Sequence, residues 1–300
     1  MNHRRPCGPY FPRLKYRLLA LDLDGTLLQP DHTVAPEERE AIAAAQAAGC
    51  LVLPCTGRAW HESADPLKPV EGLSLGVFVT GCLVQEIDTG RVVHQAGLAP
   101  ELAHEVIEHL RDLPEAVLAF RTRHTAGYDF LVTGDGELTD NTAWWFAYTG
   151  TLHTALRHPG PEDLTDCVRV GVVSTHAHLA ERLGPLREAF GDRITAHSFP
   201  GLVREGTATE DRVEILEVFP AGVSKWTGIR SVADAHGIPD EEIAFVGDQI
   251  NDLPALRAAG CSVAMGNAVP EAVEAARHRT AGHTEHGVAQ AIHKMLDGDW

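Results

Sequence analysis

One short segment of the chain holds two acidic side chains whose spacing points to chemistry. Asp22 and Asp24 lie two positions apart in the apolar run LALDLDGTLL (residues 19–28), which breaks at Gly25. In a strand, two such side chains would lie on the same face and bring like charges together. If Asp22 ends the strand and Asp24 belongs to the turn that Gly25 permits, both carboxylates can converge just beyond the sheet edge. Such an arrangement usually requires a cation.

Three other polar signatures lie at the ends of predicted elements of the chain. They are CTGR (Cys55 to Arg58), GDQIND (Gly247 to Asp252) after the apolar run EIAFV, and SK (Ser224, Lys225) at the start of a helix. Asp22 and Asp248, with a backbone carbonyl near Asp24, would give hard oxygen ligands for Mg²⁺. A carboxylate can attack phosphorus and form an aspartyl phosphate, while the metal and a lysine balance the phosphoryl charge. Together these signatures predict phosphoryl transfer.

A calcium-binding loop is the alternative interpretation of the Asp-x-Asp-Gly pattern. Such a loop requires Gly at its sixth position and Glu at its twelfth. Counting from Asp22, these positions hold Leu27 and Thr33, so the spacing excludes the loop. CTGR alone or Lys225 alone would be weak evidence, and the prediction depends on all four signatures occurring in order.

The elements that must position these residues alternate between strands and helices. Apolar runs such as LLALDLD, CLVLPC and EIAFVGD read as buried strands, and PEEREAIAAAQAAG reads as a helix with Pro36 in its first turn and Gly49 after its end. After Gly222, the segments SKWTGIRSVADAHG, LPALRAAG, EAVEAARHR and HGVAQAIHKML read as helices, and CSVAMGN as a strand. This order predicts an α/β fold with a doubly wound parallel sheet.

The middle of the chain has a different character. CLVQEIDTGRVVHQ has a hairpin signal at Asp-Thr-Gly, and the following strands alternate polar and apolar residues, as in an antiparallel sheet covered on one face. We therefore expect an inserted α+β domain. The predicted organisation is a first core part over residues 1–85, the inserted domain over 86–219 and a second core part over 220–300, with 1–16 as a flexible extension.

The motifs, in their order, resemble those of the haloacid dehalogenase superfamily, and specifically its Cof-type phosphatases. The resemblance covers the chain from about Tyr16 onward. It depends on DLDGTLL, TGR, GVSKWTGI, GDQINDLPALRAAG, AMGNA and HGVAQAI. It implies a Rossmann-like core with a large cap inserted between the second and third motifs.

The resemblance also implies a role for each motif residue. Asp22 would be the nucleophile, and Asp24 the general acid and base. Thr56, Gly57, Lys225 and Asn251 would bind the phosphoryl group, with Lys225 also counted as catalytic. Asp22, Asp24 and Asp248 would form the Mg²⁺ site, and Asp252 would support it.

The sequence departs from the family pattern near the expected substrate end. Thr80-Gly81-Cys82 stands where family members commonly have Asn-Gly-Ala, and Trp226 where Gly often follows the lysine. Within the expected cap, Trp144, Trp145, Phe146 and Tyr148 could line a sugar pocket, although packing is their more common role. Arg121, Arg123, His124 and Arg204 could hold a second anionic group, although basic residues more often lie on a solvated face.

Composition limits the classes of partner. The formal net charge is −17, with 25 Lys+Arg against 42 Asp+Glu, so nucleic acid and anionic membranes are not expected as partners. Six cysteines without CxxC spacing predict buried reduced thiols rather than disulfides or zinc ligands. We expect a cytoplasmic protein, since no apolar run reaches the ~20 residues of a membrane helix. We also expect a monomer or small homo-oligomer.

The sequence thus predicts a Mg²⁺-dependent phosphatase that hydrolyses a small phosphate ester, most plausibly a sugar phosphate, through an aspartyl-phosphate intermediate. Two alternatives stay open at this stage. One is a phosphomutase of the same superfamily, which would return the phosphoryl group to sugar. The other is a protein that only binds a phosphate ligand.

Overall fold

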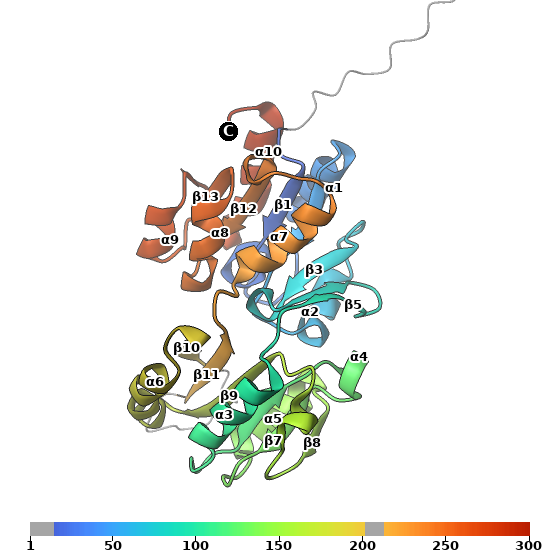
Figure 1. The fold of residues 1–300 in the computed structure, drawn as a ribbon. Coiled ribbons are helices and arrows are strands. Elements are labelled where there is room, and N and C mark those ends of the chain that lie inside the picture. Colours follow the sequence, from blue (N-terminus) through green and yellow to red (C-terminus); the bar gives the residue numbers. More distant parts are fainter. Residues whose placement is uncertain (1–14, 202–212) are drawn as a thin grey trace, which may run out of the picture. The chain divides into compact units, whose positions relative to one another are not determined.

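The computed structural model describes residues 15–201 and 213–300, which form two compact units (Figure 1). The first unit consists of residues 15–57, 64–77 and 229–300, and the second of residues 58–63 and 78–228 outside the gap. Most of the predicted N-terminal extension, and also Arg204, lie outside the described residues. Tyr16, at the end of that extension, is buried.

The first unit is built around a parallel sheet of five strands in the order β14-β13-β12-β1-β2. Its central strands β1 and β12 are completely buried, which explains their continuous apolar sequences. The doubly wound parallel sheet predicted from the sequence is confirmed. The elements of this unit are β1 (Leu18–Leu21), α1 (Pro36–Ala47), β2 (Leu51–Pro54), β12 (Ile243–Gly247), α8 (Leu253–Ala258), β13 (Cys261–Ala264), α9 (Pro270–Ala275), β14 (His278–Arg279) and α10 (Gly287–Asp297).

Helix α1 has the ends that its sequence predicts. Pro36 occupies the first helical position, where its missing N–H costs nothing, and Gly49 follows the end of the helix with φ +89°. Helix α1 packs against α10. Three elements contain residues of both units: α2 (Trp60–Leu67), β3 (Leu75–Phe78) and α7 (Lys225–Ala235).

One predicted helix is wrong in its second half. The segment EAVEAARHR is helical only as far as Ala275, and Ala276 is already extended, with φ −83° and ψ 150°. His278 and Arg279 instead form β14, which pairs in parallel with β13 at the edge of the sheet. Hydrogen bonding to the edge strand β13 overrides the modest helix propensity of these residues.

The second unit contains a six-stranded sheet in the order β10-β11-β9-β6-β7-β8. Its pairings are antiparallel except that of β7 with β8, which agrees with the alternating pattern in the sequence. The predicted hairpin is also present, with Gly90 at φ +68° in its turn. The elements are β4 (Leu83–Glu86), β5 (Val92–Gln95), α3 (Pro100–Leu110), β6 (Val117–Phe120), α4 (Arg123–Ala126), β7 (Phe130–Thr133), α5 (Asp140–Thr149), β8 (His153–Ala155), β9 (Arg169–Thr175), α6 (His176–Phe190), β10 (Ile194–Pro200) and β11 (Val213–Pro220).

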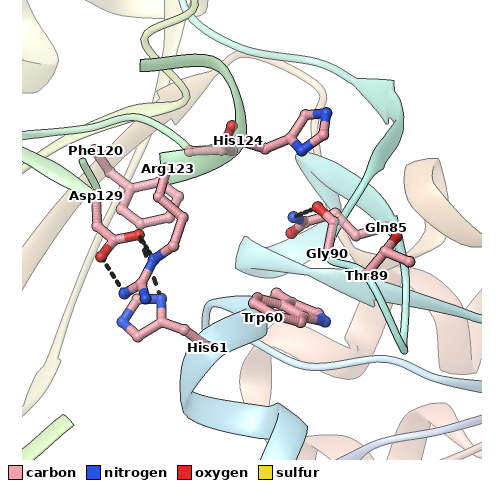
Figure 2. Close-up of a pocket in the computed structure, with 10 residues that line it drawn as sticks. Trp60, His61, Gln85, Thr89, Gly90, Phe120, Arg123, His124 and Asp129 are labelled. Atoms are coloured by element: carbon pink, nitrogen blue, oxygen red, sulfur yellow. Dashed lines mark hydrogen bonds and ion pairs between the residues drawn. The ribbon is translucent and has the colours of Figure 1, made fainter. Parts of the chain in front are cut away.

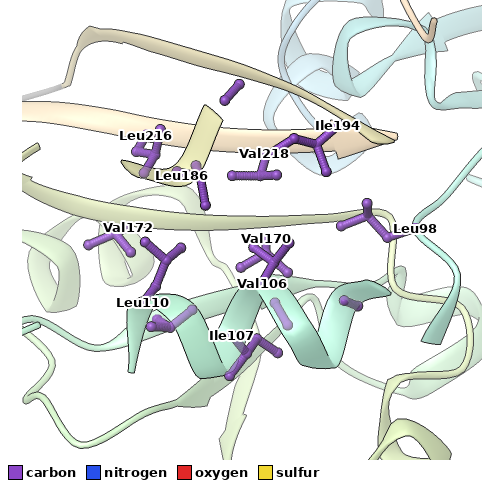
Figure 3. Close-up of a cluster of buried hydrophobic side chains, with 14 of the residues drawn as sticks. Leu98, Val106, Ile107, Leu110, Val170, Val172, Leu186, Ile194, Leu216 and Val218 are labelled. Carbon is purple, nitrogen blue, oxygen red and sulfur yellow. The ribbon is translucent and has the colours of Figure 1, made fainter. Parts of the chain in front are cut away.

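The core of this unit forms where helices cover one face of the sheet. Figure 3 shows Val106 and Leu110 of α3 beside Val170 and Val172 of β9, with Leu186 of α6 near β11. Each of these side chains is completely buried. This unit therefore has a hydrophobic core of its own.

The aromatic residues of α5 are divided between packing and exposure. Phe146 is buried and stacks on Phe130 of β7, with ring centroids 5.3 Å apart. Tyr148 is 69% exposed and stacks on Trp144. The packing role expected from the sequence thus holds for Phe146.

Two further expectations can be compared with the described residues. The cysteines among them, Cys50, Cys55, Cys82, Cys167 and Cys261, are free and buried, as predicted. In the part of the chain that the structure describes, every helix is too short or too polar to cross a membrane.

Candidate active site

Neighbouring parallel strands bring the two principal aspartates to the same sheet edge. β1 pairs with β12, with Leu21 opposite Val246, so Asp22 and Asp248 both follow strand ends at the carboxyl edge. The backbone N–H of Asp22 donates to the carbonyl of Val246 at 3.0 Å. Convergence of the two carboxylates therefore follows from the sheet register.

A third carboxylate completes the acidic group. One carboxylate oxygen each from Asp22, Asp248 and Asp252 lie within 4.8 Å of one another. All three residues are buried, with exposed fractions of 4%, 2% and 0%. Burying three carboxylates this close would be unfavourable unless a positive charge is shared among them.

Asp252 also shapes the loop that carries Asp248. Its Oδ2 accepts hydrogen bonds from the backbone N–H groups of Asp248 and Gln249, at 2.8 and 2.9 Å. The Oδ1 atom of neighbouring Asn251 is buried and accepts no hydrogen bond from the described residues.

The turn Leu23–Leu27 explains the Gly-Thr that follows the aspartates. Gly25 has φ +72°, and a Cβ at this position would lie 2.4 Å from Oδ2 of Asp248, so only glycine fits. The Thr26 hydroxyl, which is fully buried, donates to Oδ1 of Asp248 at 2.9 Å. The turn thus places the backbone of Gly25 and the hydroxyl of Thr26 against the carboxylate of Asp248.

Asn267 is a supporting residue to which the sequence patterns gave no role. Its side-chain amide donates to the carbonyl of Gly25 at 2.8 Å, and its Oδ1 accepts from the N–H of His283 at 3.0 Å. Asn267, which follows β13 in the chain, therefore helps to hold the turn Leu23–Leu27 in place. The motif AMGNA contained it, but spacing alone could not reveal this contact.

The other predicted site residues are divided between the two units. Asp24 is exposed, in the same turn as Gly25. Thr56 is buried after β2, and its N–H donates to the carbonyl of Val77 at 2.9 Å, with half-buried Gly57 next to it. Lys225 is completely buried at the first position of α7 and belongs to the second unit, whereas the aspartates belong to the first.

The donor set fits a hard divalent cation. Carboxylate oxygens from Asp22 and Asp248 and the nearby backbone carbonyls are the ligand types that Mg²⁺ takes, with positions left over for water and phosphate. Soft ligands are absent from the described acidic group, which contains only aspartates.

Comparison with known proteins gives the family. A family model described as haloacid dehalogenase-like hydrolase matches residues 19–292. The chain is 31% identical over 287 residues to YxeH of Bacillus subtilis (strain 168), whose name includes the word phosphatase, covering 94% of this chain and 98% of that protein. It is 26% identical over 306 residues to YwtE of the same organism, named a 5-amino-6-(5-phospho-D-ribitylamino)uracil phosphatase, covering 95% and 99%.

Solved structures show the same fold. TM0651 from Thermotoga maritima matches with a TM-score of 0.72 at 22% identity, covering 93% of this chain and 97% of that one. BT4131, titled a haloacid dehalogenase subclass IIB sugar phosphatase, matches with a TM-score of 0.70 at 20% identity, covering 93% and 99%. The chain belongs to the haloacid dehalogenase-like hydrolases, as a Cof-type phosphatase of that family.

Proposed function

We propose that this protein is a Mg²⁺-dependent phosphatase that hydrolyses a small phosphorylated metabolite, most plausibly a sugar phosphate, through an aspartyl phosphate on Asp22. The observation that carries the proposal is the group of three buried carboxylates at the ends of β1 and β12. A bound cation would offset the repulsion among these buried carboxylates and would place positive charge beside a substrate phosphate.

The proposed ligands of the ion are the carboxylates of Asp22 and Asp248 and a backbone carbonyl near Asp24. Asp252 supports them through its hydrogen bonds to the loop that carries Asp248. When bound, Mg²⁺ supplies positive charge that offsets the charge of the phosphoryl oxygens.

The chemistry then proceeds on the protein's own side chains. A carboxylate oxygen of Asp22 attacks phosphorus, the bond from phosphorus to the ester oxygen breaks, and Asp24 gives its proton to the leaving oxygen. Asp24 next takes a proton from water, whose oxygen attacks phosphorus while the bond from phosphorus to the Asp22 oxygen breaks, which releases inorganic phosphate and restores the Asp22 carboxylate. Thr56 and the Gly57 N–H bind the phosphoryl group, and Lys225 neutralises it.

The domain boundaries of the cap stay a prediction. We propose that residues 86–219 act as the cap, with hinges near Gln85 and Pro220, and that closure excludes water and large substrates. Support for a sugar phosphate comes from the family resemblance and from the name of the structural neighbour BT4131.

Phosphate release by the purified protein tests the proposal. Release would be measured with Mg²⁺ and then with excess EDTA, on p-nitrophenyl phosphate and a panel of sugar phosphates. Asp22→Asn should lose at least a thousandfold in kcat because the amide is not a nucleophile, while its circular dichroism spectrum stays unchanged. Asp192→Asn, at an exposed position of the second unit, is the matched control and should keep full activity.

The other outcomes identify the alternatives. Near-normal turnover by Asp22→Asn would rule out the assigned nucleophile. Formation of a sugar bisphosphate without net phosphate release would identify a phosphomutase, and tight ester binding without turnover would identify a binding protein.

A further inference from the structure

The short segment Met265–Val269, which follows β13, contacts the backbones of two strand-end motifs. The N–H of Val269 donates to the carbonyl of Asp248 at 3.0 Å. The side-chain amide of Asn267 donates to the carbonyl of Gly25 at 2.8 Å. All of these residues belong to the first unit. One segment therefore connects the two halves of the acidic group.

On its other side, this segment is attached to the residues that follow β14. The N–H of Gly266 donates to the carbonyl of Ala281 at 2.9 Å, and the guanidinium of Arg279 donates to the carbonyl of Gly266 at 3.0 Å. A Cβ at residue 266 would lie 2.7 Å from the backbone nitrogen of Gly282, so only glycine allows this close approach. These contacts hold the segment without the side chain of Asn267.

The side-chain amide of Asn267 has a donor on one side and an acceptor on the other. Its Oδ1 accepts from the backbone N–H of His283 at 3.0 Å, and its Nδ2 donates to Gly25. Because an amide oxygen only accepts and an amide nitrogen only donates, these two partners favour a single orientation of the group. Asn267 is exposed, so its contribution lies in these hydrogen bonds rather than in burial of its side chain.

The turn that contains Gly25 is in direct contact with Asp248. A Cβ at residue 25 would lie 2.4 Å from Oδ2 of Asp248, and the Thr26 hydroxyl donates to Oδ1 of the same carboxylate at 2.9 Å. A shift of the turn would therefore change the separation between the carboxylates of Asp22 and Asp248. Their mutual repulsion favours such a shift when no cation offsets it, and the hydrogen bond from Asn267 opposes it.

We propose that Asn267 is a positioning residue that sets the cation selectivity of the acidic group. By holding Gly25 against Asp248, it keeps the carboxylates at a fixed separation. This inference rests on the Mg²⁺ site of the proposed function. Mg²⁺ requires near-ideal octahedral geometry at about 2.0–2.1 Å, whereas Ca²⁺ accepts more flexible sets of oxygen ligands at about 2.3–2.6 Å. Loosening the turn should therefore weaken the binding of Mg²⁺ much more than that of Ca²⁺.

Cation binding by the purified full-length protein, measured by isothermal titration calorimetry without substrate, tests the proposal. Asn267→Ala should raise the Kd for Mg²⁺ at least tenfold and the Kd for Ca²⁺ less than threefold. The ratio of the two constants is the decisive readout, because a general loss of stability would weaken the binding of both cations alike. The Mg²⁺ concentration that gives half-maximal hydrolysis of p-nitrophenyl phosphate should rise by the same factor as the Kd for Mg²⁺.

Gln290→Ala is the matched control for this measurement. Gln290 is exposed and belongs to the first unit, and its side-chain amide donates to the carbonyl of Glu285 at 2.8 Å. The substitution removes a hydrogen bond of the same kind and length, but one that does not reach the turn around Gly25. Both dissociation constants should stay at their wild-type values.

The outcomes separate this inference from the proposed function. A selective loss of Mg²⁺ affinity in Asn267→Ala supports the inference even if the wild type hydrolyses no ester, a result that would refute only the phosphatase. If the wild type is an Mg²⁺-dependent phosphatase but folded Asn267→Ala keeps the wild-type ratio, the inference is overturned and the proposed function stands. An equal change of the ratio in Gln290→Ala also overturns it, and a wild type that binds no Mg²⁺ refutes both. If circular dichroism shows that Asn267→Ala does not fold, Asn267→Ser decides by the same ratio.

Discussion

At the scale of single residues, the backbone of Thr80 is held in a conformation that its side chain disfavours. Thr80 has φ +55° and ψ 29°, and Val79 before it has φ +50°. β-branched residues rarely occupy the left-handed region, whereas Asn does so more readily. The family's common Asn at this position therefore has a physical explanation that the sequence pattern alone did not provide.

Thr80→Asn should stabilise the protein by about 0.5–1 kcal/mol, since Asn relieves part of the backbone strain at similar volume. Urea unfolding at 25 °C measures the change. Thr133→Asn is the matched control, because Thr133 is a buried threonine in β7 whose hydroxyl donates to the carbonyl of Arg157 at 3.0 Å. The control should destabilise, and an equal loss in both variants would contradict the strain argument.

At the scale of elements, α1 places an acidic side chain against the start of α10. Glu38 is completely buried, and burial raises its pKa from 4.5 to about 7, although the backbone N–H groups of Ala289 and Val288 lower it in part. The folded protein thus keeps this carboxyl protonated at a pH where the unfolded chain has ionised it. Stability from this group is complete below about pH 4.5 and is lost as the pH rises towards 7.

Glu38→Gln should remove this pH dependence. At pH 8, the variant should be more stable than the wild type by up to about 3 kcal/mol, because a pKa shift of this size costs the ionised folded state that much. At pH 4.5, the two proteins should differ little. Denaturant unfolding across this pH range measures the effect, and the exposed neighbour Glu37→Gln should show no comparable trend. A gain that is equal at both pH values would disprove the linkage.

The elements also show which features of the structure could be predicted from the sequence. Strand-end motifs such as that of Asp22 are contiguous, and parallel strands always present their carboxyl ends at one edge, so the acidic group could be predicted. The cavity lined by Trp60, Phe120 and Asp129 (Figure 2) could not be predicted from the sequence. These residues come from segments far apart in the chain, and only tertiary packing brings them together. β14 was missed for a similar reason, since its conformation depends on a neighbouring strand rather than on its own residues.

At the scale of the whole molecule, the chain has two units with separate cores, and the acidic group lies in the first. Calorimetry should therefore resolve two unfolding transitions. Mg²⁺ at about 100 times its Kd should stabilise only the first unit, by about 2.7 kcal/mol. Asp248→Asn should abolish that shift, because it removes a carboxylate from the acidic group.

Leu110→Ala, in the core of the second unit, provides the complementary variant. It should lower the other transition by about 2–5 kcal/mol in stability and leave the Mg²⁺ response intact. A single transition that responds to both Mg²⁺ and Leu110→Ala would show that the two units unfold together.

The strand order of the first unit also bears on how the protein is synthesised. β1 and β2 leave the ribosome early, but β12, which lies beside β1 in the sheet, is translated only after the whole second unit. At about 5–20 residues per second, the interval lasts roughly 10 to 40 seconds. Throughout it, one edge of β1 lacks its partner and is available to chaperones or to other nascent chains. Ribosomal stalling before β12 would therefore leave a polypeptide with a folded insert, an open sheet edge and no assembled acidic group.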